Sequence, residues 1–435
     1  MTITKMKNTK LEIEPVSNNR YCKYTKKTNR CSITKNKKEL SNFCIYNTKT
    51  KRCKKNKKIL KHKLSKKQTE KKIITNNNIY KIVNNYLSDD KNKIQQIINN
   101  YGTINNWDVS QVTEMEGLFS NYNDLLFFKF NEDISKWNVS NVKNMSYMFD
   151  HAKSFNQPLN NWNVSNVTNM IGMFAEAENY NQPLNNWNVF NVTNMEGMFW
   201  QAYNFNQSLN NWNVCNVTDM REMFHETIKF NQSLKNWDVS QVTNMSYLFV
   251  GCSKFNKDIS NWNVSNVTDM SNMFEGANQF NQSINNWNVF NVTNMGWMFW
   301  SAKLFNQPLN NWNVSNVTNM GSMFYNATSF NQPLNNWNVS QVTTMEEMFD
   351  GAKSFNQPLN NWNVSNVTNM NYMFFNAALF NQPLNNWNVS NVTTINNVKI
   401  MVGMFYGATS FNQSIDSWNV SNVTYNNMFI EYIYY

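Results

Sequence analysis

The chain has 435 residues, of which only 15% are charged, and a formal net charge of +11. The charge is divided, because residues 1–72 hold 24 Lys and Arg against 4 Asp and Glu, whereas the rest of the chain holds 15 against 24. No run of 18 apolar residues occurs and the start, MTITKMKNTK, is too polar for a signal peptide, so we expect neither membrane insertion nor conventional export.

Residues 1–75 are dominated by Lys and poor in apolar side chains, which predicts a basic, largely disordered tail. Within it, Tyr21–Cys31 and Phe43–Cys53 are a short duplication, each with eight residues between two cysteines. This spacing is compatible with small disulfide loops, with reduced thiols, or with a zinc site formed by all four cysteines. The four residues concerned are Cys22, Cys31, Cys44 and Cys53.

Residues 76–103 change character and are predicted to form a helical cap. Ile79, Ile82 and Val83 share one helical face, and Ser88-Asp89-Asp90 can begin a second helix. A repeat array exposes apolar side chains at its open end, so we expect two short amphipathic helices to cover the first repeat.

Residues 104–435 contain 13 copies of a repeat marked by Trp, then Asn or Asp, then Val. From Trp137 to Trp387 every step is 25 residues, while the first step is 30 and the last is 31. A fixed period of this length predicts a repeat solenoid in place of a conventional globular domain.

Each unit is predicted to contain one short parallel β-strand around Trp-Asn-Val and one short helical turn over Val-Thr-Asn-Met-x-x-Met-Phe. The fold class is therefore a leucine-rich-like coil of 25 residues. The regularly spaced Met side chains are interpreted as core, the alternative being an adaptable Met-rich binding groove. The recurring Asn side chains are expected to form ladders between coils and to support tight turns.

The repeat FNQPLNNWNVSNVTNMIGMFAEAEN, residues 155–179, resembles the BspA-like surface-protein repeat, and the resemblance covers Ile104–Phe429. It implies a leucine-rich-like solenoid in a group whose members are often cell-surface proteins that bind host or matrix molecules. The Lys/Asn/Ile-rich composition and the paired cysteines are similar to proteins of giant DNA viruses. That similarity implies the host cytoplasm or a virus particle as the location.

The sequence does not indicate an enzyme. His occurs only at His62, His151 and His225, and neither His-x-x-x-His nor Cys-x-x-Cys is present. No glycine-rich phosphate loop or paired carboxylates occur either. We therefore predict no catalytic residue and no cofactor, and no metal site apart from the zinc alternative for the four tail cysteines.

Departures from the repeat provide the candidate contact residues. Phe190 and Phe290 stand where other units have Ser, Trp200 and Trp300 follow the Met-Phe pair, and Trp297 lies within the same segment as Trp300. Exposed aromatic side chains are typical of contact points, although ordinary variation between repeats would also account for them.

These features favour a non-enzymatic scaffold that binds an unidentified protein or glycan through the solenoid surface. The alternative assigns the function to residues 1–75, which have the charge needed to bind nucleic acid or another polyanion. A structural role in a virus particle is the third hypothesis.

Overall fold

The computed structural model describes residues 21–25, 30–34, 44–47, 52–55, 72–120, 125–392, 394–395, 398–399, 401–418 and 428–429. The chain divides into two compact units, Met1–Lys72 and Ile73–Tyr435. The second unit thus begins a few residues before the boundary at 75 and 76 that composition suggested.

The first unit contains two β-hairpins. Strand β1 (Tyr21–Thr25) pairs antiparallel with β2 (Arg30–Thr34), and β3 (Cys44–Asn47) pairs antiparallel with β4 (Arg52–Lys55). These four strands differ from the expectation of a largely disordered tail. Alternating residues such as Tyr-Cys-Lys-Tyr-Thr favour an extended chain even in a Lys-rich context.

The register bears on the cysteine alternatives. Cys22 lies opposite Ile33 and Cys31 opposite Tyr24, so the two cysteines of the first hairpin are not direct cross-strand partners. In the second hairpin Cys44 lies opposite Lys55, and Cys53 opposite Tyr46. The structure describes the backbone of these four cysteines but not their side chains. The choice between disulfide, free thiol and zinc ligand therefore lies outside the described part of the structure.

The second unit opens with α2 (Ile79–Leu87) and α3 (Lys91–Tyr101), followed by the 3₁₀ turn η2 (Ile104–Asn106). The carboxylate of Asp90 accepts from the N–H groups at positions 92 and 93 and caps α3. Tyr86 packs edge-on against Trp107 at 5.3 Å, and Thr75 forms a parallel bridge to Gln111. Helix α2 and the residues before it therefore lie against the first repeat.

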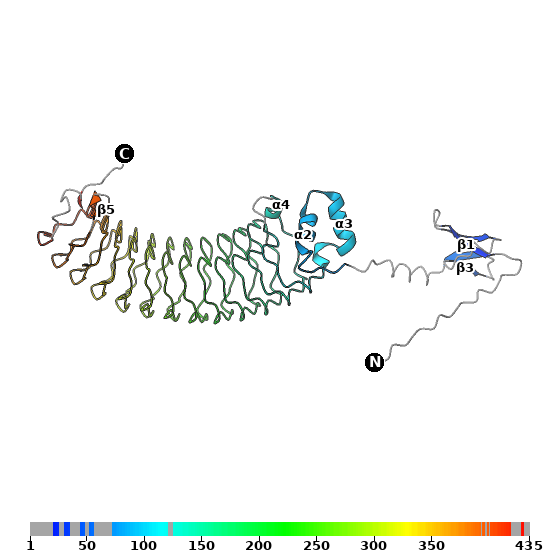
Figure 1. Cartoon of the computed structure of the whole chain (residues 1–435), viewed down its shortest axis with the longest axis horizontal. Helices are drawn as coiled ribbons and strands as arrows, with labels where there is room; N and C mark the ends of the chain where they lie inside the picture. The colour runs from blue at the N-terminus through cyan, green and yellow to red at the C-terminus, as the bar shows by residue number, and fades with distance from the viewer. Residues whose placement is uncertain are drawn as a thin grey trace. The chain divides into compact units, whose positions relative to one another are not determined.

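The 25-residue units form coils stacked along one axis (Figure 1). Parallel bridges join one residue of each coil to its equivalent in the next, in an unbroken series from Glu114↔Asn144 to Thr344↔Asn369. Around Asn169, the N–H of Thr168 donates to Lys143 O at 2.9 Å and the N–H of Met145 donates to Asn169 O at 3.0 Å. Each coil thus satisfies backbone groups of both neighbours, as strands do in a parallel sheet.

The position of this bridge corrects the predicted strand. It falls at Asn of Val-Thr-Asn-Met and not at Trp-Asn-Val, where the chain turns instead. The carboxamide of Asn163 accepts from the N–H of Ser165 at 3.2 Å, and the N–H of Val167 donates to Val164 O at 2.9 Å. Asn closes such turns with its own side chain, which competes with an extended strand.

The predicted helical turn is also wrong, because residues 135–392 contain no helix. Backbone N–H groups of Met145, Tyr147, Phe149 and His151 donate to the next coil, while those at 148, 150 and 152 donate to the carbonyl three residues earlier. Tyr147 and His151 have φ of 55° and 59°. A succession of turns with left-handed residues therefore produces the i, i+3 spacing of apolar residues that suggested a helix.

The core consists of columns of identical side chains. Trp187 and Trp212 stack with ring centroids 6.2 Å apart and planes 3° apart, and Phe149 and Phe174 stack at 5.4 Å. The methionines at the two repeated positions are fully buried wherever the structure describes them, which confirms that they are core side chains.

The Asn ladders differ from the expected chain of amides. The Oδ1 of Asn156 accepts from the backbone N–H of Asn181 at 3.0 Å and from Nε2 of Gln182 at 3.1 Å. Each Asn thus binds the backbone and the Gln side chain of the following coil. Side-chain hydrogen bonds between equivalent Asn residues of successive coils, such as that from Asn319 to Asn294 at 3.0 Å, are fewer.

Two insertions interrupt the period. The first contains α4 (Leu125–Phe128), and the second contains β5 (Thr394–Ile395) paired with β6 (Val398–Lys399). Over the described part of the chain, none of the helices has the length and apolar character needed to cross a lipid bilayer.

Candidate interaction surface

Two positions in each coil have left-handed backbone. We call the surface formed by these two positions, and by the residue directly before the second one, the variable edge. The first position has φ between 52° and 60°. It is occupied by Gly117, Tyr147, Gly172, Gly197, Glu222, Tyr247, Asn272, Trp297, Ser322, Glu347, Tyr372 and Gly403. The second is occupied by His151, Glu176, Gln201, Glu226, Gly251, Gly276, Ser301, Asn326, Gly351, Asn376 and Gly407.

Large side chains at these positions have an energetic cost. Left-handed backbone costs a residue with a Cβ atom roughly 1–2 kcal/mol, and glycine avoids that cost. Yet Tyr147, Tyr247 and Trp297 occupy it and leave 40%, 37% and 42% of their surface exposed. A strained backbone that holds a large, partly exposed side chain is typical of residues that serve an interaction.

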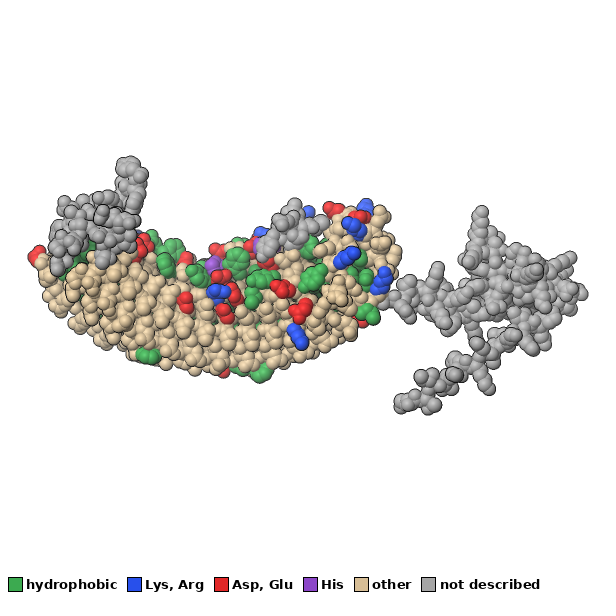
Figure 2. Space-filling model, viewed as in Figure 1, with side chains coloured by type: hydrophobic (Ala, Val, Ile, Leu, Met, Phe, Trp, Pro, Cys, Tyr) green, Lys and Arg blue, Asp and Glu red, His purple; other side chains and the backbone are tan. Residues whose placement is uncertain are grey.

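The hydrophobic and acidic side chains gather along the concave side of the array in Figure 2, whereas the opposite side is formed mainly by uncharged polar groups. Several aromatic side chains of the variable edge contact one another across coils. The His225 ring lies 6.2 Å from both Trp200 and Tyr247, and Trp300 stacks on Tyr325 at 5.4 Å. Phe375 stacks on Tyr406 at 5.1 Å.

The structure divides the candidate contact residues into two groups. Trp200, Trp297 and Trp300 all belong to the variable edge. Phe190 and Phe290 lie instead in the turn after Trp-Asn-Val, where each N–H donates to the Asn two residues earlier, and they are 45% and 46% exposed. Across the described residues, neither phenylalanine ring contacts those tryptophans, so the five do not form one site.

Charges near the start of the variable edge are paired. His151 lies 2.7 Å from an oxygen of Asp150 and 2.9 Å from one of Glu176, and Lys153 lies 2.7 Å from Glu178. Further along, Arg221 forms an ion pair with Glu196. This part of the edge therefore supplies its own counter-charges.

Carboxylates further along the edge have no such counter-charges. Burial, reinforced by the charge of Glu226, raises the pKa of Glu275. Burial and the nearby Glu347 raise the pKa of Asp350 to about 7. Beyond Lys235–Asp258, no ion pair forms among the residues that the structure describes.

His225 is half-buried between aromatic neighbours, and this burial lowers the pKa of its imidazole. Its Nδ1 has no hydrogen-bond partner within the described structure. The imidazole is therefore mostly neutral near pH 7 and can accept or donate one further hydrogen bond.

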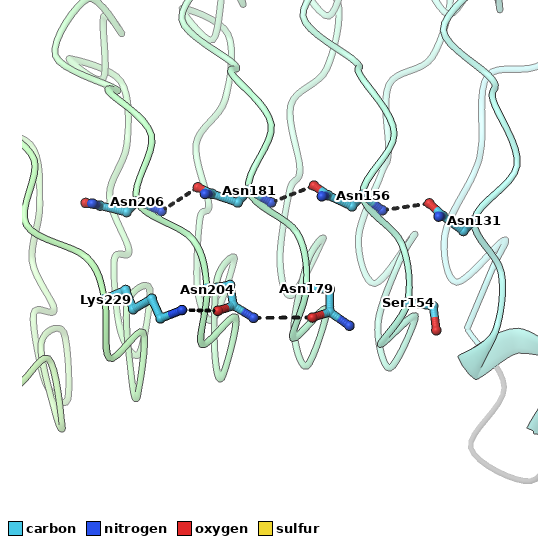
Figure 3. A pocket seen from close by; sticks show the side chains of 8 residues that line it. All are labelled: Asn131, Ser154, Asn156, Asn179, Asn181, Asn204, Asn206 and Lys229. Carbon is cyan, nitrogen blue, oxygen red and sulfur yellow. Dashed lines mark hydrogen bonds between the residues drawn. The ribbon is translucent and has the colours of Figure 1, made fainter.

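A second surface is a polar groove of about 590 Å³ lined by Asn131, Ser154, Asn156, Asn179, Asn181, Asn204, Asn206 and Lys229 (Figure 3). Its upper row repeats the Asn contacts found throughout the coils. In its lower row, Lys229 Nζ donates to Asn204 Oδ1 at 2.5 Å and Asn204 donates to Asn179 at 3.3 Å. Because these groups mainly bind one another, we interpret the groove as part of the regular surface of the coils and not as a separate binding site.

Within the described residues, no group of three or more His, Cys, Asp or Glu side chains is arranged to hold a metal ion. Sequence analysis missed His225, Tyr247, Tyr325 and Asp350 as members of the edge. The sequence does contain a signal for them, because each belongs to a column of variable residues that recurs every 25 residues. Tyr247 stands two residues after the first Met of its coil, and the other three stand directly after the Phe of the Met-Phe pair or its variant.

A family model described as "Mycoplasma protein of unknown function, DUF285" matches four consecutive stretches, residues 88–212, 202–312, 304–398 and 394–433. These matches include every coil and part of the helical cap. No curated protein and no solved structure matches the chain.

Proposed function

The chain belongs to the DUF285 family, and we propose that its coils form a leucine-rich-like solenoid of the BspA-like type, a non-enzymatic scaffold that binds a protein partner through the variable edge. The single observation that carries this proposal is the exposed aromatic side chains held in left-handed backbone. Tyr147, Tyr247 and Trp297 retain a strained conformation that glycine relieves at Gly117, Gly172, Gly197 and Gly403.

The composition of the edge fits protein recognition. Aromatic side chains supply large contact areas with little conformational entropy to lose, and they are enriched where proteins bind one another. The polar groove offers amides to a glycan, but it lacks the exposed rings on which sugars stack. We therefore favour a protein over a glycan.

An affinity capture with the full chain tests the proposal. The edge variant replaces Trp297, Trp300 and Tyr325 with Ala, and the control variant replaces Phe190 and Phe290 with Ser, the consensus residue at that position. We expect the edge variant to lose a partner that both the wild type and the control retain. Retention of every partner by the edge variant would refute the proposal.

A second candidate function rests on the charge of the first unit. Residues 1–72 carry a balance of +20, from 24 basic and 4 acidic residues, and therefore favour contact with nucleic acid or another polyanion. Such binding would weaken steeply between 50 and 200 mM salt. Deletion of residues 1–72 without any loss of DNA or RNA binding would exclude it. A structural role in a virus particle would show as the protein's presence in purified particles.

A further inference from the structure

Asp150 and Asp350 occupy the same position of the variable edge, directly after a Met-Phe pair. Both are buried, with 2% and 9% of their surface exposed. Their surroundings differ, and this difference points to a ligand.

Asp150 is satisfied by this chain. Its carboxylate accepts a hydrogen bond of 3.1 Å from the hydroxyl of Ser120 in the preceding coil and contacts His151 Nδ1 at 2.7 Å. A buried carboxylate needs such partners, because removal from water costs several kcal/mol when the charge stays unpaired.

Asp350 lacks the corresponding partners. The coil before it presents Tyr325 where Ser120 stands, and Gly351 follows it where His151 stands. Within the described structure, the Asp350 carboxylate has neither a hydrogen bond nor an ion pair. The charge that acts on it is that of Glu347 in the same coil, itself a carboxylate, which accepts from the Ser322 hydroxyl at 3.0 Å.

Aromatic rings lie next to these carboxylates. Tyr325 stacks on Trp300 at 5.4 Å with ring planes 16° apart. Burial raises the pKa of the Tyr325 phenol, and the nearby charges of Asp350 and Glu347 raise it further. Trp297 belongs to the same coil as Trp300 and is 42% exposed. The unpaired carboxylate of Asp350 and the hydrogen-bonded carboxylate of Glu347 thus adjoin a stack of two half-buried rings.

We propose that Trp300, Tyr325, Glu347 and Asp350 form a receptor for a basic side chain, and that the ligand of the variable edge is an arginine- or lysine-rich segment of a partner protein. A guanidinium group stacks on an aromatic face and binds carboxylates through two parallel hydrogen bonds, so it satisfies both halves of this cluster. The inference rests on the proposed function, for which it names the chemistry of the partner.

The charge of the neighbouring coils supports a cationic ligand. The second unit holds 24 acidic residues against 15 basic ones from residue 73 onward. Glu275 of the same edge, and Glu346 directly before Glu347, are also partly buried without an ion pair in the described part of the chain. A basic segment laid along the edge would meet several carboxylates in succession.

The test measures binding of fluorescein-labelled octaarginine to the full chain by fluorescence anisotropy, with octaglutamate as the charge control. Asp350→Asn and Trp300→Ala are the test variants, and Asp150→Asn is the matched control at the equivalent position. We expect each test variant to weaken octaarginine binding about tenfold. Asp150→Asn should bind octaarginine within about twofold of the wild type, because its carboxylate is already occupied.

The pH dependence provides a second readout. Asp350 faces Glu347 of its own coil and Tyr325 of the preceding coil, and the next coil presents the uncharged Phe375. Wild-type affinity should therefore rise between pH 6 and 8 as Asp350 loses its proton, and Asp350→Asn should abolish most of that rise.

Three outcomes would overturn the inference. They are absence of octaarginine binding by the wild type, equal affinity in Asp350→Asn, or the same loss in Asp150→Asn, which would indicate only the general negative charge. If the aromatic edge variant still loses a captured partner in any of these cases, the proposed function stands and only the cationic ligand is excluded. If that variant retains every partner, both fail.

Discussion

The indole N–H of Trp212 donates a hydrogen bond of 2.9 Å to the carbonyl oxygen of Leu184 in the preceding coil. Equivalent tryptophans repeat this contact from Trp137 onward, at 2.8 to 3.2 Å. The side chain therefore does more than fill the core, because it gives a second donor to a buried carbonyl that also accepts from the backbone N–H of Trp187 at 3.1 Å.

Replacement of Trp212 with Phe should consequently cost about 1–3 kcal/mol, since the Leu184 carbonyl loses one of its two donors and the smaller ring leaves a cavity in the core. Hydrogen exchange should show the loss of protection concentrated in the coils on either side of position 212, because each coil contacts only its neighbours. Trp297→Phe, at an exposed ring, is the control and should change stability by less than about 0.5 kcal/mol. Equal effects of the two changes would contradict a role for the buried hydrogen bond.

Two glycines of the variable edge allow the cost of left-handed backbone strain to be measured separately from the cost of a steric clash with a neighbouring side chain. Gly172 and Gly197 have φ of 55° and 57°, but a Cβ atom on Gly172 would lie 2.5 Å from the Tyr147 ring, whereas one on Gly197 would meet Trp200 Cβ at 3.8 Å. Both Ala variants should lose roughly 1–2 kcal/mol through left-handed strain. Gly172→Ala should lose more stability than Gly197→Ala, because its Cβ atom also clashes with the Tyr147 ring.

Urea denaturation of both variants measures this difference. Addition of Tyr147→Ala should remove the extra cost of Gly172→Ala and leave that of Gly197→Ala unchanged, since only the first pair is in contact. If the two single variants lose equal stability, the Tyr147 ring moves aside without cost, and the close packing of that ring over the glycine is of no energetic importance.

The sequence predicts the period and the core of the coils, because Trp, Met and Phe must recur wherever one layer stacks on the next. It does not predict the backbone between them. Met145, Met148 and Phe149 have the spacing of a helical face, yet a series of turns with left-handed residues at Tyr147 and His151 produces the same spacing. Periodicity records which side chains are buried and cannot distinguish these two backbones.

The candidate site was predictable only in part, for a related reason. Trp200, Trp297 and Trp300 stand out against the consensus as large aromatic residues. Asp350 does not, because Asp150 has the same place in its own repeat, and only the residues of the preceding coil and the following position distinguish a satisfied carboxylate from an unpaired one. The residue of the preceding coil is 25 to 30 residues away along the chain, at Tyr325 for Asp350 and Ser120 for Asp150.

Two cysteines of the coils should differ in reactivity. Cys252 is buried, donates its thiol to the Phe224 carbonyl at 2.9 Å, and has a pKa raised far above the ordinary range by burial, while Cys215 is partly exposed. Because the thiolate is the reactive form, iodoacetamide should label Cys215 in the native protein and Cys252 only after unfolding. Peptide mass spectrometry distinguishes the two sites, and rapid native labelling of Cys252 would show that the coil around it opens.

The unpaired carboxylate makes a prediction about stability against pH. Because burial and Glu347 raise the pKa of Asp350 to about 7 in the folded chain, well above the ordinary value for an aspartate, the folded state binds the proton more tightly than the unfolded state does. The contribution of Asp350 to stability is therefore most favourable below about pH 4 and is lost as pH rises through about 7. Asp350→Asn should remove this dependence and be more stable than the wild type at pH 8, by on the order of 2 kcal/mol.

Urea denaturation at pH 4.5 and pH 8, with Asp150→Asn as the control, measures the effect. Asp150→Asn should be less stable than the wild type by about 1–3 kcal/mol at pH 8, since it disturbs the contacts with Ser120 and His151. The same substitution should thus increase the stability at position 350 and decrease it at the equivalent position 150. A loss of stability at pH 8 in Asp350→Asn would mean that the carboxylate is already paired in the free protein, and the vacancy for a basic side chain would not exist.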